Sequence, residues 1–154
     1  MIVRLVTALT FAAAAGAAQP LIEAERTLEE RKAASPLVET ERTLDELKWV
    51  ARPIVVFADS PRDPRVLSQL QAFEEQTDEL LERDVVILID TDPDGGSELR
   101  TRFRPRSDFM AVLMGKDGEV KYRKPRPVTV RELMRLIDRM PMRRQEMLTR
   151  RDDS

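Results

Sequence analysis

Three aspartates at alternate positions form the most regular set of potential metal ligands in this sequence. They lie in the run Asp90-Thr91-Asp92-Pro93-Asp94-Gly95, whose alternating oxygens and following glycine match the start of a calcium-binding loop. The twelfth position is Thr101 rather than the usual bidentate glutamate. We therefore keep two interpretations: a calcium site at Asp90, Asp92 and Asp94, or a strand-to-helix loop whose aspartates cap backbone N–H groups.

A second polar cluster, Asp59, Ser60, Arg62 and Asp63, follows the apolar run Ile54-Val55-Val56-Phe57. In a βαβ unit the carboxyl end of a strand meets a helix N-terminus here, which is the usual place for a ligand. A serine nucleophile would need a base, and no histidine is present to act as one. We predict either a structural turn or an edge that contacts a ligand or peptide, with an unrecognised hydrolase as a residual alternative.

Basic residues dominate the C-terminal part of the chain. From Arg100 to Ser154 there are 16 basic and 8 acidic residues, whereas from Gln19 to Leu99 there are 9 basic and 20 acidic residues. Two interpretations stay open: the two parts pair their charges within the fold, or a basic surface contacts an anionic lipid, glycan or acidic partner. Helical spacing predicts one solvated stripe of arginines at positions Arg131, Arg135, Arg139, Arg143 and Arg144.

The composition excludes several kinds of chemistry. The 154 residues include no cysteine and no histidine, which removes disulfides, thiol nucleophiles, imidazole bases and almost every zinc site. The apolar fraction of 42% is enough for the core of one domain, and only 5% of residues are aromatic, so we expect an aliphatic core.

The N-terminal residues predict two segments before the domain. Residues 1–18 have the features of a secretory signal peptide, because Arg4 precedes an apolar run and small residues follow it. We therefore expect a periplasmic or secreted protein with no transmembrane segment in the mature chain. Residues 19–43 form a duplicated helical lead-in, since Pro20–Lys32 is repeated by Pro36–Lys48. We expect Ser35 and Pro36 to start the second helix, and the first copy to have little to pack on and to be partly mobile.

Residues 44–149 carry the pattern of one α/β domain, followed by a charged tail at 150–154. Short apolar strands are separated by a segment with an apolar face at helical spacing, which is typical of a βαβ unit. The predicted βαβ unit has strands at 54–57 and 85–89 around one helix from Pro64 to Leu81. A short helix is expected after Ser97, followed by strands at 109–114 and 119–123 that are joined by Asp117-Gly118. The last predicted helix follows the capping box Thr129-Val130-Arg131-Glu132.

This order (β-α-β, short α, β-hairpin, α) is that of the thioredoxin-like core. Three pieces make the similarity more specific: Trp49-Val50-Ala51-Arg52-Pro53-Ile54-Val55-Val56-Phe57, Lys116-Asp117-Gly118, and Ile137-Asp138-Arg139-Met140-Pro141-Met142-Arg143-Arg144-Gln145-Glu146-Met147. On these pieces the chain resembles an uncharacterised family of small exported bacterial proteins. Its peroxiredoxin-like domain also occurs in secreted animal extracellular-matrix and sushi-repeat proteins. The resemblance covers about Leu44 to Met147.

The departures from thioredoxin decide what the resemblance implies. A thioredoxin would carry reactive cysteines around Ser60 to Asp63 and a cis-proline near Met110, and this chain has neither. We therefore predict a redox-inactive, non-catalytic binding module without a cofactor, whose partner is an unknown protein or peptide. The alternatives are calcium binding and docking on an anionic envelope surface. We do not expect nucleic acid as a partner, because export is predicted and few aromatic residues are available for base stacking. The residues predicted to contact a partner are Asp59, Ser60, Arg62, Arg135, Arg139, Arg143 and Arg144.

Overall fold

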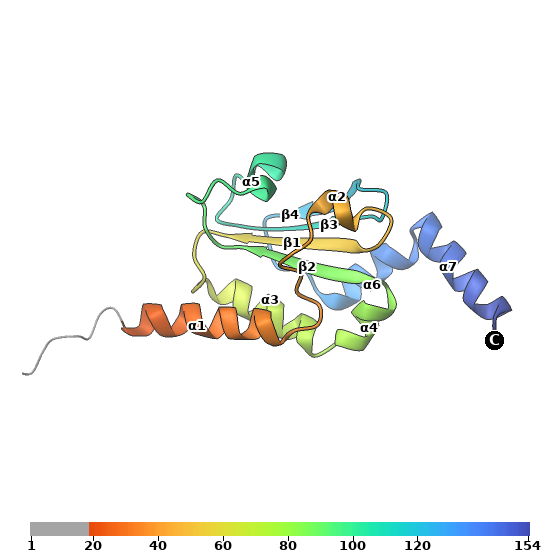
Figure 1. Cartoon of the computed structure of the whole chain (residues 1–154), viewed down its shortest axis with the longest axis horizontal. Coiled ribbons are helices and arrows are strands. Elements are labelled where there is room, and N and C mark those ends of the chain that lie inside the picture. Colours follow the sequence, from red (N-terminus) through yellow and green to blue (C-terminus); the bar gives the residue numbers. More distant parts are fainter. Residues whose placement is uncertain (1–18) are drawn as a thin grey trace, which may run out of the picture.

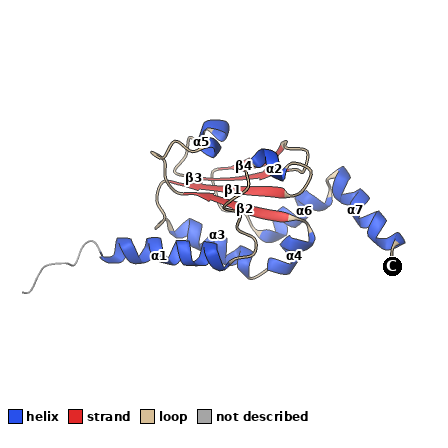
Figure 2. Cartoon of the chain, viewed as in Figure 1, coloured by secondary structure: helices blue, strands red, loops and turns tan. Residues whose placement is uncertain are grey.

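The computed structural model describes residues 19–154, with side chains from residue 27 onward (Figures 1 and 2). The predicted signal peptide, residues 1–18, lies outside the described residues. The elements in chain order are α1 (Gln19–Ala34), α2 (Leu44–Leu47), β1 (Arg52–Ala58), α3 (Pro64–Glu74), α4 (Thr77–Glu82), β2 (Val85–Asp90), α5 (Glu98–Phe103), β3 (Phe109–Met114), β4 (Val120–Lys124), α6 (Val130–Asp138) and α7 (Pro141–Asp152). No helix within residues 19–154 combines the length and the apolar character needed to cross a bilayer.

Four strands form one mixed sheet in the order β2-β1-β3-β4. β1 and β2 are parallel, with Ile54 opposite Ile87, and β3 runs antiparallel on the other side of β1, with Ile54 opposite Leu113. The parallel pair is joined through α3 and α4, because parallel strands need a long crossover connection. β3 and β4 form the predicted hairpin, in which Gly118 takes a positive φ of 80°. The predicted α/β class is confirmed, and the arrangement is consistent with a thioredoxin-like core.

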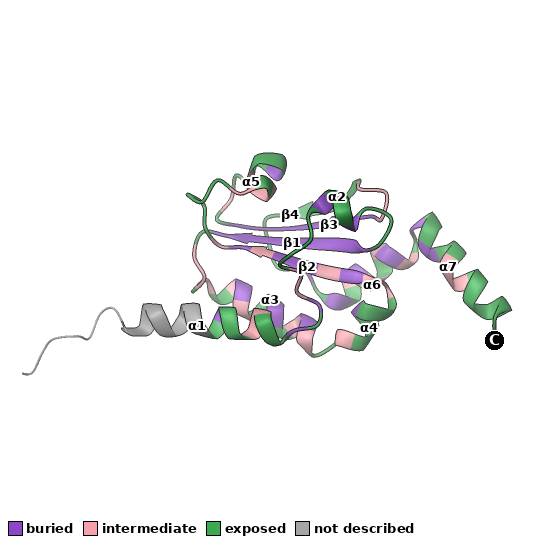
Figure 3. Ribbon diagram, viewed as in Figure 1, coloured by how far each residue is buried: buried purple, intermediate pink, exposed green. Residues whose placement is uncertain are grey.

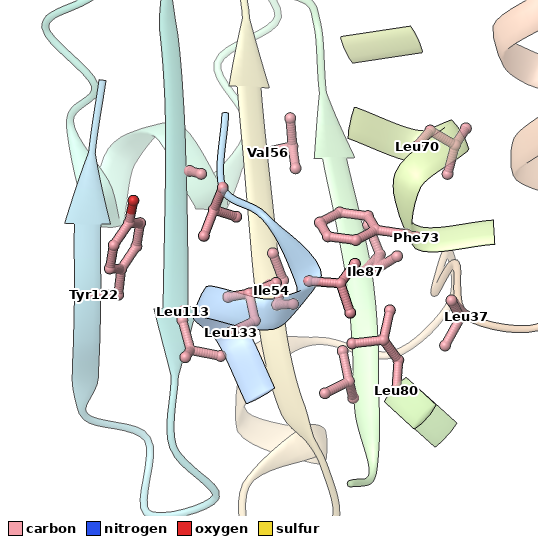
Figure 4. Packing of buried hydrophobic residues seen from close by; sticks show 14 of the residues in the cluster. Leu37, Ile54, Val56, Leu70, Phe73, Leu80, Ile87, Leu113, Tyr122 and Leu133 are labelled. Atoms are coloured by element: carbon pink, nitrogen blue, oxygen red, sulfur yellow. The ribbon is translucent and has the colours of Figure 1, made fainter. Parts of the chain in front are cut away.

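Helices cover both faces of the sheet (Figure 1). Alternate residues of β1 point to the two faces, so Ile54 and Val56 belong to the larger apolar cluster and Val55 and Phe57 to the smaller one. Every residue of β1 is buried, as expected for a central strand covered on both sides (Figure 3). Figure 4 shows the larger cluster, whose labelled members are Leu37, Ile54, Val56, Leu70, Phe73, Leu80, Ile87, Leu113, Tyr122 and Leu133.

The first copy of the N-terminal repeat is part of the packed domain. It lies in α1, where the side chain of Leu28 is 0% exposed and belongs to the larger apolar cluster. Arg31 in the last turn of α1 forms an ion pair with Glu74 of α3, at 2.7 Å. The expectation that this copy has little to pack on is therefore wrong for its C-terminal half.

The second copy does not continue as a helix where the sequence predicted one. Val38 forms an isolated parallel bridge with Ile87 of β2, and Leu37 is buried beside it. The N–H of Ile87 donates to the carbonyl of Leu37, and the N–H of Glu39 donates to the carbonyl of Ile87, both at 2.8 Å. These bonds pair backbone groups on the outer edge of β2. The free energy gained by this pairing outweighs the local preference of Ser35 and Pro36 for starting a helix.

Two further boundaries differ from the sequence prediction. The helix expected from Pro64 to Leu81 is interrupted between Glu74 and Thr77. This break changes the helical phase, so Leu81 is exposed instead of facing the core. The predicted charged tail at 150–154 is mostly the last turn of α7, a helix whose far half extends away from the body of the protein (Figure 1).

Replacing Leu28 by alanine tests whether α1 belongs to the cooperative fold. The fully buried side chain would leave a cavity, so Leu28→Ala should lower the free energy of unfolding by about 2–4 kcal/mol. Urea denaturation measures this change. The matched control is Leu148→Ala on α7, where the side chain is 54% exposed and the expected change is within about 0.5 kcal/mol. Equally small changes in both variants would show that α1 unfolds separately.

Candidate functional site

The turn after β1 is built around a helix cap. Asp63 accepts a hydrogen bond from the backbone N–H of Arg65 at 2.9 Å, and it is the N-cap of α3 that the sequence predicted. The Arg65 guanidinium also pairs with Asp63 at 2.6 Å and with Asp108, just before β3, at 3.0 Å. The hydrogen bonds from Arg65 lower the pKa of the Asp63 carboxyl despite its partial burial. Asp63 therefore has a structural role in this turn.

The other polar residues of this turn are less engaged. Asp59 and Arg62 are exposed, and the side chain of neither forms a hydrogen bond or an ion pair with the described part of the chain. The hydroxyl of Ser60 accepts a hydrogen bond from the backbone N–H of Arg62 at 3.2 Å, which shapes the turn. Contact between a partner and Asp59, Ser60 and Arg62 stays a prediction.

A buried ion pair closes the carboxyl ends of β1 and β2. The carboxylate of Asp90 accepts hydrogen bonds from Arg100, at 2.9 Å, and from the hydroxyl of Ser97. Burial raises the pKa of Asp90, but the bonds from Ser97 and Arg100 outweigh it and hold the pKa below its usual value. Arg100 also donates to the carbonyl of Ala58 at 2.7 Å, which ties the two strand ends together.

The predicted calcium ligands are not brought together. Asp90 is already neutralised by Arg100, and a side-chain oxygen of Asp92 accepts the backbone N–H of Asp94 at 3.2 Å. Across the residues whose side chains are described, no group of three or more carboxylates is placed to hold a metal ion. The loop instead matches the other interpretation, in which aspartates bond to nearby backbone N–H groups.

The predicted arginine stripe is divided between the surface and the interior. Arg131, Arg135 and Arg139 are exposed along α6 and line a groove of about 460 Å³. Arg144 is exposed on α7. The prediction that Arg143 is solvated is wrong, because its side chain is 1% exposed and turns inward to pair with carboxylates.

A buried ion cluster joins α7 to the starts of β1 and β2. Arg52 is fully buried and donates to both carboxylate oxygens of Glu146, at 3.0 and 3.3 Å, and to the carbonyl of Arg83 at 2.8 Å. Lys116 donates to the same carboxylate and to Asp84, each at 2.8 Å. Burial raises the pKa of Glu146, but the bonds from Lys116 and Arg52 outweigh it, so the pKa is lowered and the carboxylate is charged.

The same cluster continues between α4, α6 and α7. Arg143 pairs with Glu82 at 3.0 Å and with Asp138 at 3.4 Å, while Arg83 pairs with Asp138 at 2.9 Å. Burial of Asp138 is outweighed by the bonds from Arg83 and Arg143, which lower its pKa. Acidic and basic groups therefore alternate, and each of the buried guanidinium groups, Arg52 and Arg143, is paired with a carboxylate.

The three sequence pieces that carry the family resemblance meet in this cluster. Arg52 comes from the first piece, Lys116 from the hairpin, and Asp138, Arg143 and Glu146 from the last. The sequence pattern alone does not identify the cluster. The available signal was Arg52, a charged residue at the start of an otherwise apolar strand, because such a residue needs a partner when it is buried.

Trp49 lies beside the cluster in an unusual backbone conformation. Its φ of 68° is in the left-handed region, which costs a non-glycine residue about 1–2 kcal/mol. The conformation is held by the backbone N–H of Trp49, which donates to the carbonyl of Lys116 at 2.7 Å. The side chain is 60% exposed, and the Lys48 ammonium lies 5.6 Å from the ring centre. A strained, exposed aromatic residue marks a candidate functional site.

A pocket of about 320 Å³ opens between Trp49, the β3–β4 hairpin and the start of α7. The walls are mainly apolar, with Trp49, Met140, Pro141 and Met142, and the hairpin residues Gly115, Lys116, Asp117 and Lys121 also line the pocket. Arg52 also lines the pocket, and its Nε has no hydrogen-bond acceptor among the described residues. This Nε atom is itself enclosed by protein atoms, so the pocket offers room for an apolar group but does not expose the unpaired donor.

Exposed large apolar side chains gather at this end of the molecule. Trp49 and Val50 precede β1, Leu81 precedes β2, and Val120 begins β4. The pairing of the strands places all these positions at one end of the sheet, opposite the Asp59–Asp63 turn (Figure 1). The exposed large apolar residues among the described side chains are Trp49, Val50, Leu81, Val120, Met142 and Leu148, the last two on α7.

A comparison with known protein families gives a match over residues 43–146, about two thirds of the chain. The matching family is described as a domain of unknown function, DUF4174. The chain belongs to this family. No curated protein matches the chain. The predicted membership of an uncharacterised domain family is confirmed.

The DUF4174 region contains the α/β core and ends within the ion cluster. It begins at Thr43, the N-cap of α2, whose side chain and that of Glu46 form a capping box. It ends at Glu146, the residue that pairs with Arg52. The helix α1 precedes the DUF4174 region, and the far half of α7 follows it.

Removing the charge of Glu146 should destabilise the domain. Glu146→Gln leaves the buried guanidinium of Arg52 without its counter-charge, so we expect the free energy of unfolding to fall by about 3 kcal/mol in urea denaturation at neutral pH. The matched control is Glu30→Gln on α1, an exposed residue without an ion pair among the side chains that the structure describes, with an expected change within about 0.5 kcal/mol. A loss below about 1 kcal/mol for Glu146→Gln would show that the cluster contributes little.

Acid should weaken the same cluster. The pKa of Glu146 is lower in the folded protein than its usual value of 4.5, so its contribution to stability is complete above about pH 4.5 and is lost as the pH falls through the folded pKa. The stability difference between the natural protein and Glu146→Gln should be constant near neutral pH and shrink below about pH 4.5. Urea denaturation over a pH series measures it. A difference that is unchanged in acid contradicts the assignment.

Proposed function

We propose that this DUF4174 protein is a non-catalytic binding module that contacts a protein or peptide partner. The contact surface consists of Trp49, Val50, Val120 and Met142 together with the pocket beside Trp49, and we call it the Trp49 surface. The observation that carries the proposal is a strained, exposed tryptophan beside an apolar pocket, at the end of the sheet where further exposed apolar side chains occur. We also propose export, on the basis of the leader-like pattern of residues 1–18.

The residue types of the Trp49 surface support an interaction role. Tryptophan, methionine and arginine are enriched at protein interfaces, and a tryptophan beside a pocket is a frequent centre of binding energy. Single exposed apolar residues are common on any protein, but their collection at one end is not. Trp49 contributes nothing to the apolar clusters, so packing of the core does not explain its strained position.

The chemistry of the opposite end supports a non-catalytic role. At the turn where a thioredoxin would react, Asp63 is used as a helix cap, and nearby Asp90 is paired with Arg100. The whole chain contains no cysteine or histidine that could act as a nucleophile or base there. Turnover of a thiol, a peroxide or an ester by the purified protein alone would overturn this part of the proposal.

A second candidate function is docking on an anionic surface through α6. Arg131, Arg135 and Arg139 have no ion-pair partner among the described residues, and like charges at this spacing repel each other along a helix. Steeply salt-dependent binding to anionic vesicles, lost when Arg135 and Arg139 are replaced by glutamine, would support this candidate. Arg143 is unsuitable for this test because it is buried in the ion cluster.

Replacing Trp49 by glycine should separate function from stability. Glycine takes positive φ without strain, so Trp49→Gly should leave the free energy of unfolding unchanged or raise it by up to about 1 kcal/mol in urea denaturation. The matched control is Ile54→Gly in the buried sheet, which should lose more than about 3 kcal/mol. A loss above about 1 kcal/mol for Trp49→Gly would assign the tryptophan a structural role instead.

Photo-crosslinking in cells tests the proposed function. A photoreactive residue at Val50, on the Trp49 surface, should give a discrete adduct, and the same adduct should disappear when Trp49→Gly is added. The matched position is Arg62, at the opposite end of the sheet, where no Trp49-dependent adduct is expected. An adduct at Arg62 alone would move the binding site to the turn after β1. No adduct at Val50 contradicts the proposal.

A further inference from the structure

The two edges of the sheet differ in how far they are covered. β2 forms one edge, where the backbone of Ile87 bonds to Leu37 and Glu39 at 2.8 Å. β4 forms the other edge, and the strand that carries Tyr122 is the outermost one in Figure 4. Within the described part of the chain, the backbone of residues 120–124 hydrogen-bonds only to β3. The outer side of β4 therefore presents unpaired N–H and C=O groups.

β4 is held in its strand conformation from inside the fold. Tyr122 is buried in the larger apolar cluster, whereas the other side chains of this strand are exposed. Nη2 of Arg123 donates to the carbonyls of Phe103 and Arg104, the latter at 3.3 Å. An added strand would meet this preformed edge and would not have to order β4 first.

The chain on this side of the molecule is strongly basic. Residues 99–140 include β3, β4, α6 and most of α5, and they contain 12 basic and 5 acidic residues. Four exposed cations at or near the carboxyl end of β4 have no ion-pair partner among the described side chains: Arg104, Arg106, Arg123 and Lys124. Anionic groups are therefore attracted to this end of the edge.

The carboxylates around β4 do not cancel this charge. They are Asp108, paired with Arg65, Asp117 and Glu119, paired with Lys121, and Glu132, paired with Arg126. Lys121 serves two carboxylates, so the hairpin end of β4 is not positive. Arg65 also serves Asp63, which leaves one negative charge against the four cations at the other end. A partner should therefore place its carboxylates beside the last residues of β4.

We propose that the outer edge of β4 binds an extended acidic segment of a partner protein by strand addition. The backbone of the segment pairs with the unpaired groups of β4, and its carboxylates lie beside Arg104, Arg123 and Lys124. Cations along the edge disfavour a second β4 in this position, and a lipid surface has no backbone groups to pair. The edge begins at Val120, which also belongs to the Trp49 surface, but the proposal does not depend on binding there.

Peptide selection tests the chemistry of the partner. A displayed library of short random peptides is selected on the immobilised full chain, after removal of peptides that bind the double variant Arg104→Glu, Lys124→Glu. Neither side chain forms a hydrogen bond or an ion pair within the described part of the chain, so the variant should fold normally. We expect acidic sequences rich in β-branched residues, which favour strands. Enrichment of neutral or basic sequences, or no enrichment, overturns the inference.

Titration of one enriched synthetic peptide tests the residues. In calorimetry, Arg104→Gln and Lys124→Gln should each weaken binding about three- to fivefold. The matched controls are Arg135→Gln on α6 and Arg151→Gln on α7, both exposed cations, with unchanged affinity. If Arg135→Gln weakens binding and Lys124→Gln does not, the peptide binds α6 and the inference is overturned.

N-methylated versions of the same peptide test the backbone pairing. A strand bonds to an edge through alternate residues, so methylating one alternate set of N–H groups should weaken binding about tenfold more than methylating the other set. Amide hydrogen exchange of the full chain should slow within residues 120–124 when the peptide binds, and should stay unchanged in β2. Equal effects of the two sets, or unchanged exchange in β4, overturn strand addition.

The variant Trp49→Gly separates this inference from the proposed function. The peptide should bind Trp49→Gly as tightly as it binds the natural protein. Loss of binding in Trp49→Gly, with unchanged affinity of Lys124→Gln, would assign the peptide to the Trp49 surface, which overturns this inference and supports the proposed function. A dimer in sedimentation velocity whose β4 amides are protected before peptide is added would assign the edge to a second copy, and it overturns the inference as well.

Discussion

The buried ion pair between Arg52 and Glu146 is the constraint on which this end of the molecule depends. A guanidinium at the start of the central strand cannot be buried without a counter-charge, and the carboxylate that supplies it comes from α7. Lys116 shares that carboxylate, and the backbone carbonyl of Lys116 accepts the N–H of Trp49. One charge pair thus helps to place the C-terminal helix, the hairpin and the exposed tryptophan, and these three elements form the pocket.

The two ends of the sheet are organised differently. At the carboxyl end of β1, polar side chains are used within the fold: Asp63 caps α3, and Asp90 is held by Arg100. At the amino end of β1, the guanidinium of Arg52 is buried and paired with Glu146, and the nearby side chains of Trp49 and Val50 are exposed. The turn that would hold the reactive cysteines of a thioredoxin is therefore used within the fold in this protein. The exposed apolar side chains and the pocket of the Trp49 surface lie at the opposite end of the sheet.

Local sequence signals predicted most of the elements but failed where a tertiary contact competed with them. The strands at 85–90 and 109–114 and the caps at Asp63, Ser97 and Thr129 agree with the patterns in the sequence. The helix expected after Ser35 was replaced by pairing of Val38 with the edge of β2. The stripe expected to include Arg143 was broken because Glu82 and Asp138 draw that side chain inward. In each case a long-range partner outweighed a local preference.

The sequence by itself determined the α/β class, the lack of thiol and imidazole chemistry, and the family pieces, because these follow from residue types and from spacing along the chain. Only the tertiary structure decided which charges are buried and which are free. The carboxylate of Glu146 lies far from Arg52 in sequence, and no periodicity indicates that they meet. The candidate site could not be found from the sequence for the same reason, since Trp49, Lys116 and Met142 come together only when the strands pair and α7 packs.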